Sequence, residues 1–167
     1  LITRNMAAAL MERELMLMKP VRENGVSFVR ADAEVTKAKK NLILAQELFP
    51  PDHYLSKSLA SRIKVLEYCE PAPYTNNKTI DENLANIKAS YQQKRSLLLK
   101  ALELEPNMAS TYTFLSTAYR VDKMSDSSIY YQERVVELLP NEVFSNFNAA
   151  LNYSSIKLKD DNGKFKP

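Results

Sequence analysis

The fold of this chain is decided by residues 101–141, which read ALELEPNMASTYTFLSTAYRVDKMSDSSIYYQERVVELLPN. The stretch begins with ALELEPN and ends with the closely similar VVELLPN. Pro106 and Pro140 are therefore 34 residues apart, and a third copy of the phrase, AQELFP, ends upstream at Pro50. Each copy is typical of the last turn of an amphipathic helix, because proline cannot continue the helix beyond it. The sequence therefore predicts a repeated helical unit.

Between the two later prolines the sequence resembles a tetratricopeptide repeat, whose ~34-residue unit carries W-x2-L-G-x2-Y, then A-x3-F, then P. The residues at the matching positions are, in family order, Tyr112, Leu115, Ser116, Tyr119, Ser128 and Pro140. Gln132 departs from the pattern, because the family has an aromatic residue there. Ser116 and Ser128 are small, so we expect two helices to approach each other closely at these residues.

The resemblance implies an all-α fold, a right-handed superhelix of helical hairpins. We expect one array over residues 1–167, with repeats at 4–50, 52–106 and 109–140 and an incomplete repeat at 142–167. The second repeat is 22 residues longer than the period, because Pro50 and Pro106 are 56 residues apart. We therefore expect both helices of its hairpin to be extended, with residues 70–79 joining their tips. The composition agrees with helices, since the chain has only two glycines.

The N-terminal part predicts two helices. Residues 4–18 are rich in alanine, methionine, leucine and glutamate, which are strong helix formers, and Pro20 should end this helix. We expect its methionines to pack against the next helix; they are Met6, Met11, Met16 and Met18. The second predicted helix covers residues 27–49. Its apolar stripe at helical spacing consists of Ala38, Leu42, Ala45 and Leu48.

Five later helices are predicted from capping residues and apolar stripes. Their expected ranges are 52–69, 80–105, 109–121, 126–139 and 142–157. Short polar side chains can accept hydrogen bonds from the first turn of a helix, so we expect N-caps at Asp52, Thr79, Asn107 and Ser125. Thr79 also has Glu82 three residues later, which completes a capping box.

The residues show no catalytic constellation. There is no glycine-rich phosphate loop, no paired-cysteine metal spacing and no Ser–His arrangement with a recognisable elbow. His53 is the only histidine and is expected at the surface, and the single cysteine, Cys69, is expected to pack as a small apolar residue. We therefore predict no enzyme activity and no cofactor. The net charge of +3 gives no support for a nucleic-acid partner, and no apolar run reaches the ~18 residues of a membrane span.

The resemblance implies binding of a protein or peptide along the concave side, which the first helix of each repeat lines. The candidates carried over on that basis are Tyr54, Lys57, Lys64, Thr113, Thr117, Arg120, Phe144, Phe147 and Leu151, together with Ser61 and Ser110. An alternative is that Lys57, Lys64 and Arg120 form an ordinary solvated face. We predict no clamp for a peptide carboxylate, because Ser61, Thr117 and Leu151 are not the asparagines that it needs.

The predicted function is protein–protein interaction, as a scaffold or accessory segment of a larger protein. One alternative is a regulatory or substrate-positioning domain fused to an enzyme whose catalytic part lies outside this chain. Another is an envelope lipoprotein with helices of this kind. We interpret the chain as a piece of a longer protein or as a mature chain after signal removal, and the residues do not indicate a compartment. Helix 142–157 lacks the second helix of its repeat, so self-association through its apolar strip is also expected.

Overall fold

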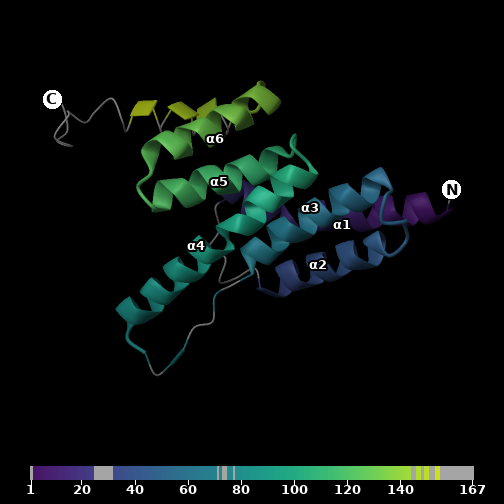
Figure 1. The fold of residues 1–167 in the computed structure, drawn as a ribbon, viewed down its shortest axis with the longest axis horizontal. Helices are drawn as coiled ribbons and strands as arrows, with labels where there is room; N and C mark the ends of the chain where they lie inside the picture. Colours follow the sequence, from purple (N-terminus) through teal and green to yellow (C-terminus); the bar gives the residue numbers. More distant parts are fainter. Residues whose placement is uncertain are drawn as a thin grey trace. The chain divides into compact units, whose positions relative to one another are not determined.

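The computed structural model describes residues 2–24, 32–70, 72, 75–76, 78–143, 146–147, 149–150 and 153–154. Its described residues confirm the predicted all-α class (Figure 1). The helices are α1 (Ile2–Asn24), α2 (Asp32–Gln46), α3 (Tyr54–Cys69), α4 (Ile80–Leu104), α5 (Ala109–Val121) and α6 (Ser125–Leu138). The residues described beyond α6, between 143 and 154, are also helical.

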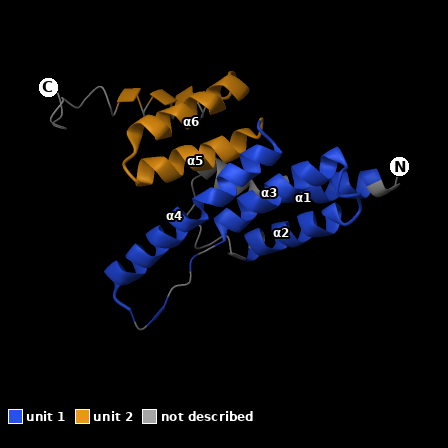
Figure 2. Ribbon diagram, in the orientation of Figure 1, with its two compact units in different colours: residues 1–106 blue, residues 107–167 orange. Residues whose placement is uncertain are grey.

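The chain divides into two compact units, which Figure 2 colours separately. Unit 1 is Leu1–Pro106 and contains α1 to α4, whereas unit 2 is Asn107–Pro167 and contains α5, α6 and the residues that follow. Inside unit 1, α2 packs against α1 and α3, and α3 also packs against α4. Inside unit 2, α5 packs against α6. Helices that are neighbours in sequence are therefore neighbours in space within each unit.

The core of unit 1 forms because each helix has apolar residues three or four positions apart, which places them on one face. The predicted stripe of α2 is confirmed, since Ala38, Leu42 and Ala45 are fully buried and Leu48 is half-buried. The residues that α3 and α4 contribute to the core include Leu59, Val65, Leu66, Cys69, Leu98 and Ala101. The predicted burial of Cys69 is thus confirmed.

The first helix differs from its prediction in two respects. It continues through Pro20 to Asn24, so the prediction that Pro20 ends it was wrong. Proline has a φ that suits a helix, but inside one it lacks an N–H donor and its ring crowds the carbonyl four residues back, so it can kink a helix without ending it. The methionines also do not all pack inward, since Met6 and Met16 are 54% and 66% exposed. The residues that α1 does bury include Ala7 and Glu14.

The second helix ends three residues earlier than predicted. Its last turn tightens, because the N–H groups of Leu48 and Phe49 bond to the carbonyls of Ala45 and Gln46, three residues back, at 3.2 and 3.1 Å. Its predicted start near Ser27 lies outside the described residues.

Three of the four predicted N-caps were wrong. His53, not Asp52, caps α3, because its Nδ1 accepts a hydrogen bond from the Leu55 N–H at 3.2 Å. The N-caps of α5 and α6 are Met108 and Met124, neither of which makes a side-chain capping bond. The predicted Asn107 precedes the cap of α5, and Ser125 is already the first residue of α6.

The capping box of α4 is confirmed. The Thr79 hydroxyl accepts from the Glu82 N–H at 3.2 Å, and the Glu82 carboxylate accepts from the Thr79 N–H at 2.8 Å. Bonding to the Thr79 N–H and hydroxyl lowers the pKa of the Glu82 carboxyl. This reciprocal pair fixes the start of the longest helix of the chain's described part, at 25 residues.

The connection of the α3–α4 hairpin has the predicted bounds, residues 70–79, and the extra length of the hairpin lies mainly in α4. α4 has 25 residues and α3 has 16. Asn83, which is 1% exposed, holds the connecting segment against the start of α4. Its side chain accepts from the Thr75 N–H at 3.0 Å and donates to the carbonyls of Thr75, Lys78 and Thr79 at 3.1, 3.2 and 3.0 Å. Thr75, Lys78 and Thr79 of the connection are thus held against the first turn of α4.

Candidate interaction surface

In unit 1, the exposed candidates lie in the first turn of α3. Tyr54 is 61% exposed and Lys57 is also exposed. The turn is positioned by His53, which is half-buried and stacks on Phe49 with ring centroids 4.7 Å apart. His53 is also 4.7 Å from the Tyr54 ring, and Arg4 of α1 donates to the Tyr54 hydroxyl at 3.2 Å. The expected surface histidine is therefore a half-buried cap that supports an exposed tyrosine.

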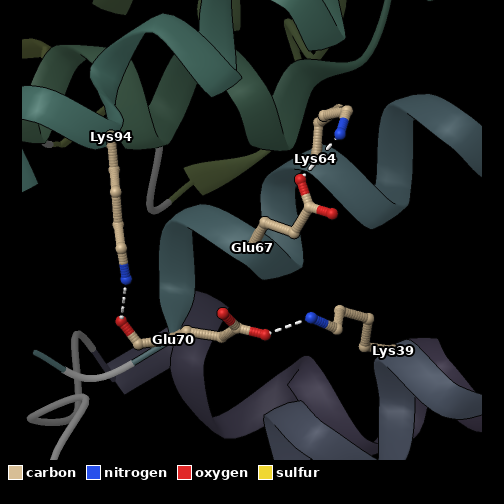
Figure 3. Close-up of polar contacts among 5 residues, drawn as sticks. All are labelled: Lys39, Lys64, Glu67, Glu70 and Lys94. Atoms are coloured by element: carbon tan, nitrogen blue, oxygen red, sulfur yellow. Dashed lines mark hydrogen bonds and ion pairs between the residues drawn. The ribbon is translucent and has the colours of Figure 1, made fainter.

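Lys64, the third candidate on α3, is engaged inside unit 1. Its Nζ lies 2.8 Å from the Glu67 carboxylate in the same helix. Figure 3 shows this pair beside a second cluster at the end of α3. There the Glu70 carboxylate pairs with Lys39 of α2, and the Glu70 carbonyl accepts from Lys94 of α4 at 2.9 Å. At the end of α3, polar contacts of Glu70 thus link α3 to α2 and α4.

Ser61 is not a surface residue, so its place among the candidates was wrong. It is fully buried, and its hydroxyl donates to the Ala101 carbonyl of α4 at 2.7 Å. Nearby, the Ser58 hydroxyl donates to the Glu105 carboxylate at 2.9 Å. α3 packs against α2 and also against α4, and the side that carries Ser58 and Ser61 is the one that α4 covers.

In unit 2, the candidates on α5 lie on one face of the helix. Thr113, Thr117 and Arg120 follow one another at helical spacing. Thr117 and Arg120 are exposed, whereas Thr113 is half-buried and donates from its hydroxyl to the Ala109 carbonyl at 3.2 Å. Ser110 is also half-buried. Arg120 lies in the last turn of α5, where a cation is favoured by the helix dipole.

The other side of α5 packs on α6 through a reciprocal serine contact, which confirms the expected close approach of Ser116 and Ser128. Each is 3% exposed. The Ser116 hydroxyl donates to the Ser128 carbonyl at 2.9 Å, and the Ser128 hydroxyl donates to the Ser116 carbonyl at 2.9 Å. Gln132, which departs from the family pattern, is buried with its Oε1 3.4 Å from the Ser116 hydroxyl. A polar group thus occupies the position expected for an aromatic ring.

Beyond α6, Phe147 is 58% exposed, whereas Phe144 and Leu151 lie outside the described residues. In the same segment Ala149 is half-buried, and Ala150 and Tyr153 are exposed. The Tyr153 hydroxyl donates to the Glu133 carboxylate of α6, and this bond raises the pKa of Tyr153. Self-association through residues 142–157 stays a prediction.

A cluster of tyrosines between α5 and α6 was not predicted as a group. Tyr131 stacks on Tyr119 with ring centroids 5.3 Å apart, and it lies 5.1 Å from Tyr130 and 6.2 Å from Tyr112. The Arg134 guanidinium lies 5.8 Å from the Tyr112 centroid. The signal was present in the sequence, because Tyr112 and Tyr119 are seven residues apart and so share a helix face.

The described residues offer no assembled chemical centre. Within the described ranges, no three His, Cys, Asp or Glu side chains are grouped so that they could hold a metal ion. Among the described helices, none is both long and apolar enough to cross a membrane. The candidates that are exposed and described are therefore Tyr54 and Lys57 in unit 1, and Thr117, Arg120 and Phe147 in unit 2.

Comparisons with protein-family models, with curated proteins and with solved structures find no match to this chain. The exposed candidates on α3 and α5 include two cations and an aromatic ring, and both helices pack against a neighbouring helix.

Proposed function

We propose that this chain is a protein-interaction module with the architecture of a tetratricopeptide array, a right-handed superhelix of helical hairpins. The observation that carries the proposal is the reciprocal contact of Ser116 and Ser128. Small residues at these two positions are what the family's pattern requires. In the proposal the chain binds a protein segment and performs no catalysis itself.

In this proposal each unit has a binding face, the exposed side of the first helix of its hairpin. On α3 it presents Tyr54 and Lys57, and on α5 it presents Thr117 and Arg120. An arginine guanidinium donates two parallel hydrogen bonds to a carboxylate, and an aromatic ring with a polar tip supplies contact area with little loss of entropy. The partner that fits this face is a protein segment with acidic side chains.

Selection of peptides from a random phage-displayed library on the immobilised protein tests the proposal. We expect enrichment of acidic peptides, whose affinity is then measured by fluorescence anisotropy. The charge reversals Lys57→Glu and Arg120→Glu should each weaken binding about tenfold or more, which is about 1.4 kcal/mol. Lys100→Glu, at an exposed position of α4, is the matched control and should bind like the parent.

Two results would contradict the proposal. One is a selection in which no peptide is enriched over the uncoated surface. The other is a set of selected peptides whose affinity falls with Lys100→Glu but not with either Lys57→Glu or Arg120→Glu. Circular dichroism of every variant establishes that the fold is retained.

A further inference from the structure

One apolar stripe runs along α4, and only half of it is covered. Its members are Ile80, Leu84, Ile87, Tyr91, Leu98 and Ala101. Leu98 and Ala101 are fully buried in unit 1, where α4 packs against α3. At the other end, Ile80 is 72% exposed and Leu84 is 57% exposed. Figure 1 shows the beginning of α4 reaching past the end of the shorter α3.

The spacing of the stripe is that of a coiled-coil seam. From Ile80 to Tyr91 its members are alternately four and three residues apart, so Ile80 and Ile87 occupy d positions of a heptad and Leu84 and Tyr91 occupy a positions. Tyr91 marks the border of the covered half, because its ring lies 5.5 Å from that of Tyr68 in α3. The uncovered seam therefore spans about 12 residues, or about 18 Å of helix, with Ile80 and Leu84 exposed and Ile87 and Tyr91 half-buried.

The two flanks of the uncovered seam differ. On one flank Asn83 is buried under the connecting segment that it holds. On the other flank Asp81 and Lys88 are exposed and seven residues apart, so both occupy e positions. In an antiparallel pair of helices, e positions face e positions of the other helix. Asp81 of one copy then faces Lys88 of the other, and this pair occurs twice about the two-fold axis.

A parallel pair lacks this complementarity. In that arrangement a g residue faces the e residue five positions later on the other helix, so Lys88 would face Asn83, whose side chain is already engaged by its own loop, and Asp81 would face no residue of the other helix. We propose that residues 80–91 of α4 form an antiparallel two-helix interface with the same residues of a second copy of this chain. Leu84 of each copy packs against Ile87 of the other. Because so short a seam buries less area than a standard interface, the association is weak and reversible.

Light scattering on the full chain over a concentration series tests the interface. The average mass of the parent should rise from that of one chain towards that of two. Leu84→Lys should stay at one chain, because it places two lysines in the seam. Its melting temperature should match the parent, since Leu84 is exposed within one chain. Val143→Lys, at an 81% exposed apolar position in unit 2, is the control and should associate like the parent.

A parent that keeps the mass of one chain up to its highest soluble concentration would overturn the proposal. So would association that is lost in Val143→Lys and kept in Leu84→Lys, which would place the contact on residues 142–157.

A charge swap tests the antiparallel direction. Lys88→Asp places aspartates opposite each other at both ends of the seam and should weaken association at least about tenfold. The double variant Asp81→Lys/Lys88→Asp restores two opposite-charge pairs and should recover association to near that of the parent. Association that is equally weak in the single and the double variant would overturn the antiparallel pairing.

Discussion

Lys123 lies in the turn that follows α5 and has a backbone conformation that suits glycine. Its φ is 60°, the one positive φ among the described non-glycine residues. The Met124 N–H bonds to the Tyr119 carbonyl at 2.9 Å, and the Lys123 N–H bonds to the Arg120 carbonyl at 3.0 Å. These two bonds make a Schellman motif, in which the left-handed residue is usually glycine because a Cβ crowds the following carbonyl. The turn between α5 and α6 therefore carries local strain.

We expect Lys123→Gly to stabilise unit 2 by about 0.5–1 kcal/mol, because relief of the left-handed strain exceeds the added entropy of the unfolded chain. Urea unfolding followed by circular dichroism measures the change. Lys123→Ala is the control and should bring no such gain, since alanine keeps the Cβ. A glycine variant no more stable than the alanine variant would show that the conformation is unstrained.

For single residues, the sequence predicted the contact that the repeat pattern requires. It missed the roles that depend on side chains or backbone packed nearby in the fold. Ser116 and Ser128 were predicted as a close contact from their positions in the pattern, and the structure confirms it. His53 was missed as a cap, because histidine is not among the usual N-cap residues; here its ring stacks on Phe49 and its Nδ1 accepts from the Leu55 N–H. Lys123 carries no sequence signal, because lysine rarely adopts a positive φ.

Among the elements, α1 is joined to α3 by a buried ion pair. The Arg62 guanidinium lies 3.0 Å from the Glu14 carboxylate, and their side chains are 19% and 2% exposed. Removing one partner of such a pair leaves the other charge in a medium that solvates it poorly. A second ion pair lies in α3, two residues after Arg62. It joins Lys64 and Glu67 at 2.8 Å, and their side chains are 34% and 28% exposed. The two pairs differ mainly in burial.

We expect Arg62→Met to destabilise unit 1 by about 3–5 kcal/mol, because methionine keeps much of the apolar stem but leaves the Glu14 carboxylate without this guanidinium. Lys64→Met should change the free energy of unfolding by less than about 1 kcal/mol, because water screens its partly exposed pair. Thermal unfolding of both variants measures the difference. Equal destabilisation by the two would contradict the role assigned to burial.

The helices themselves were largely predictable, since their signals are local. The range of α5 was predicted correctly at both ends, and Thr79 and Glu82 marked the start of α4. The prediction that α1 ends at Pro20 was wrong, because a proline inside a helical pattern can kink the helix instead of ending it. The end of α3 at Cys69 and the start of α4 at Ile80 match the predicted ranges, whereas the predicted start of α3 at residue 52 was two residues too early.

For the whole molecule, the sequence predicted the all-α class, which the structure confirms, and one array over residues 1–167, which stays a prediction. Apolar spacing of three and four residues fixes which face of a helix is buried, but not how helices collect into compact bodies. The division after Pro106 falls between two predicted repeats, where α4 ends and α5 has yet to begin. The candidate surface stays a prediction, and the structure describes only which of its residues are exposed. Tyr54, Lys57, Thr117 and Arg120 are exposed, whereas Ser61 is covered by α4, the next helix of the chain.

Both units contain tyrosines whose ionisation opposes folding. Burial raises the pKa of Tyr91 to about 12 and that of Tyr68 further, and burial also raises the pKa of Tyr131 in unit 2. Tyrosines in the unfolded chain ionise near pH 10. The native state therefore prefers the neutral phenols, and their contribution to stability is complete below about pH 10. It is lost as the pH rises from about 10 towards about 12. Alkaline pH should therefore lower the free energy of unfolding of both units, because their buried tyrosines ionise more readily in the unfolded chain.

Tyr91→Phe tests this dependence, because it removes one of the raised phenols and keeps the ring beside Tyr68. A full shift of about two pKa units would correspond to about 2.7 kcal/mol, and partial exposure of the ring reduces the expected effect to about 1 kcal/mol. Between about pH 10 and 12 the variant should lose that much less stability than the parent, as measured by urea unfolding at a series of pH values. Tyr54→Phe, at a ring that is 61% exposed, is the control and should follow the parent. Identical pH dependence in Tyr91→Phe and the parent would mean that the Tyr91 phenol does not couple ionisation to folding.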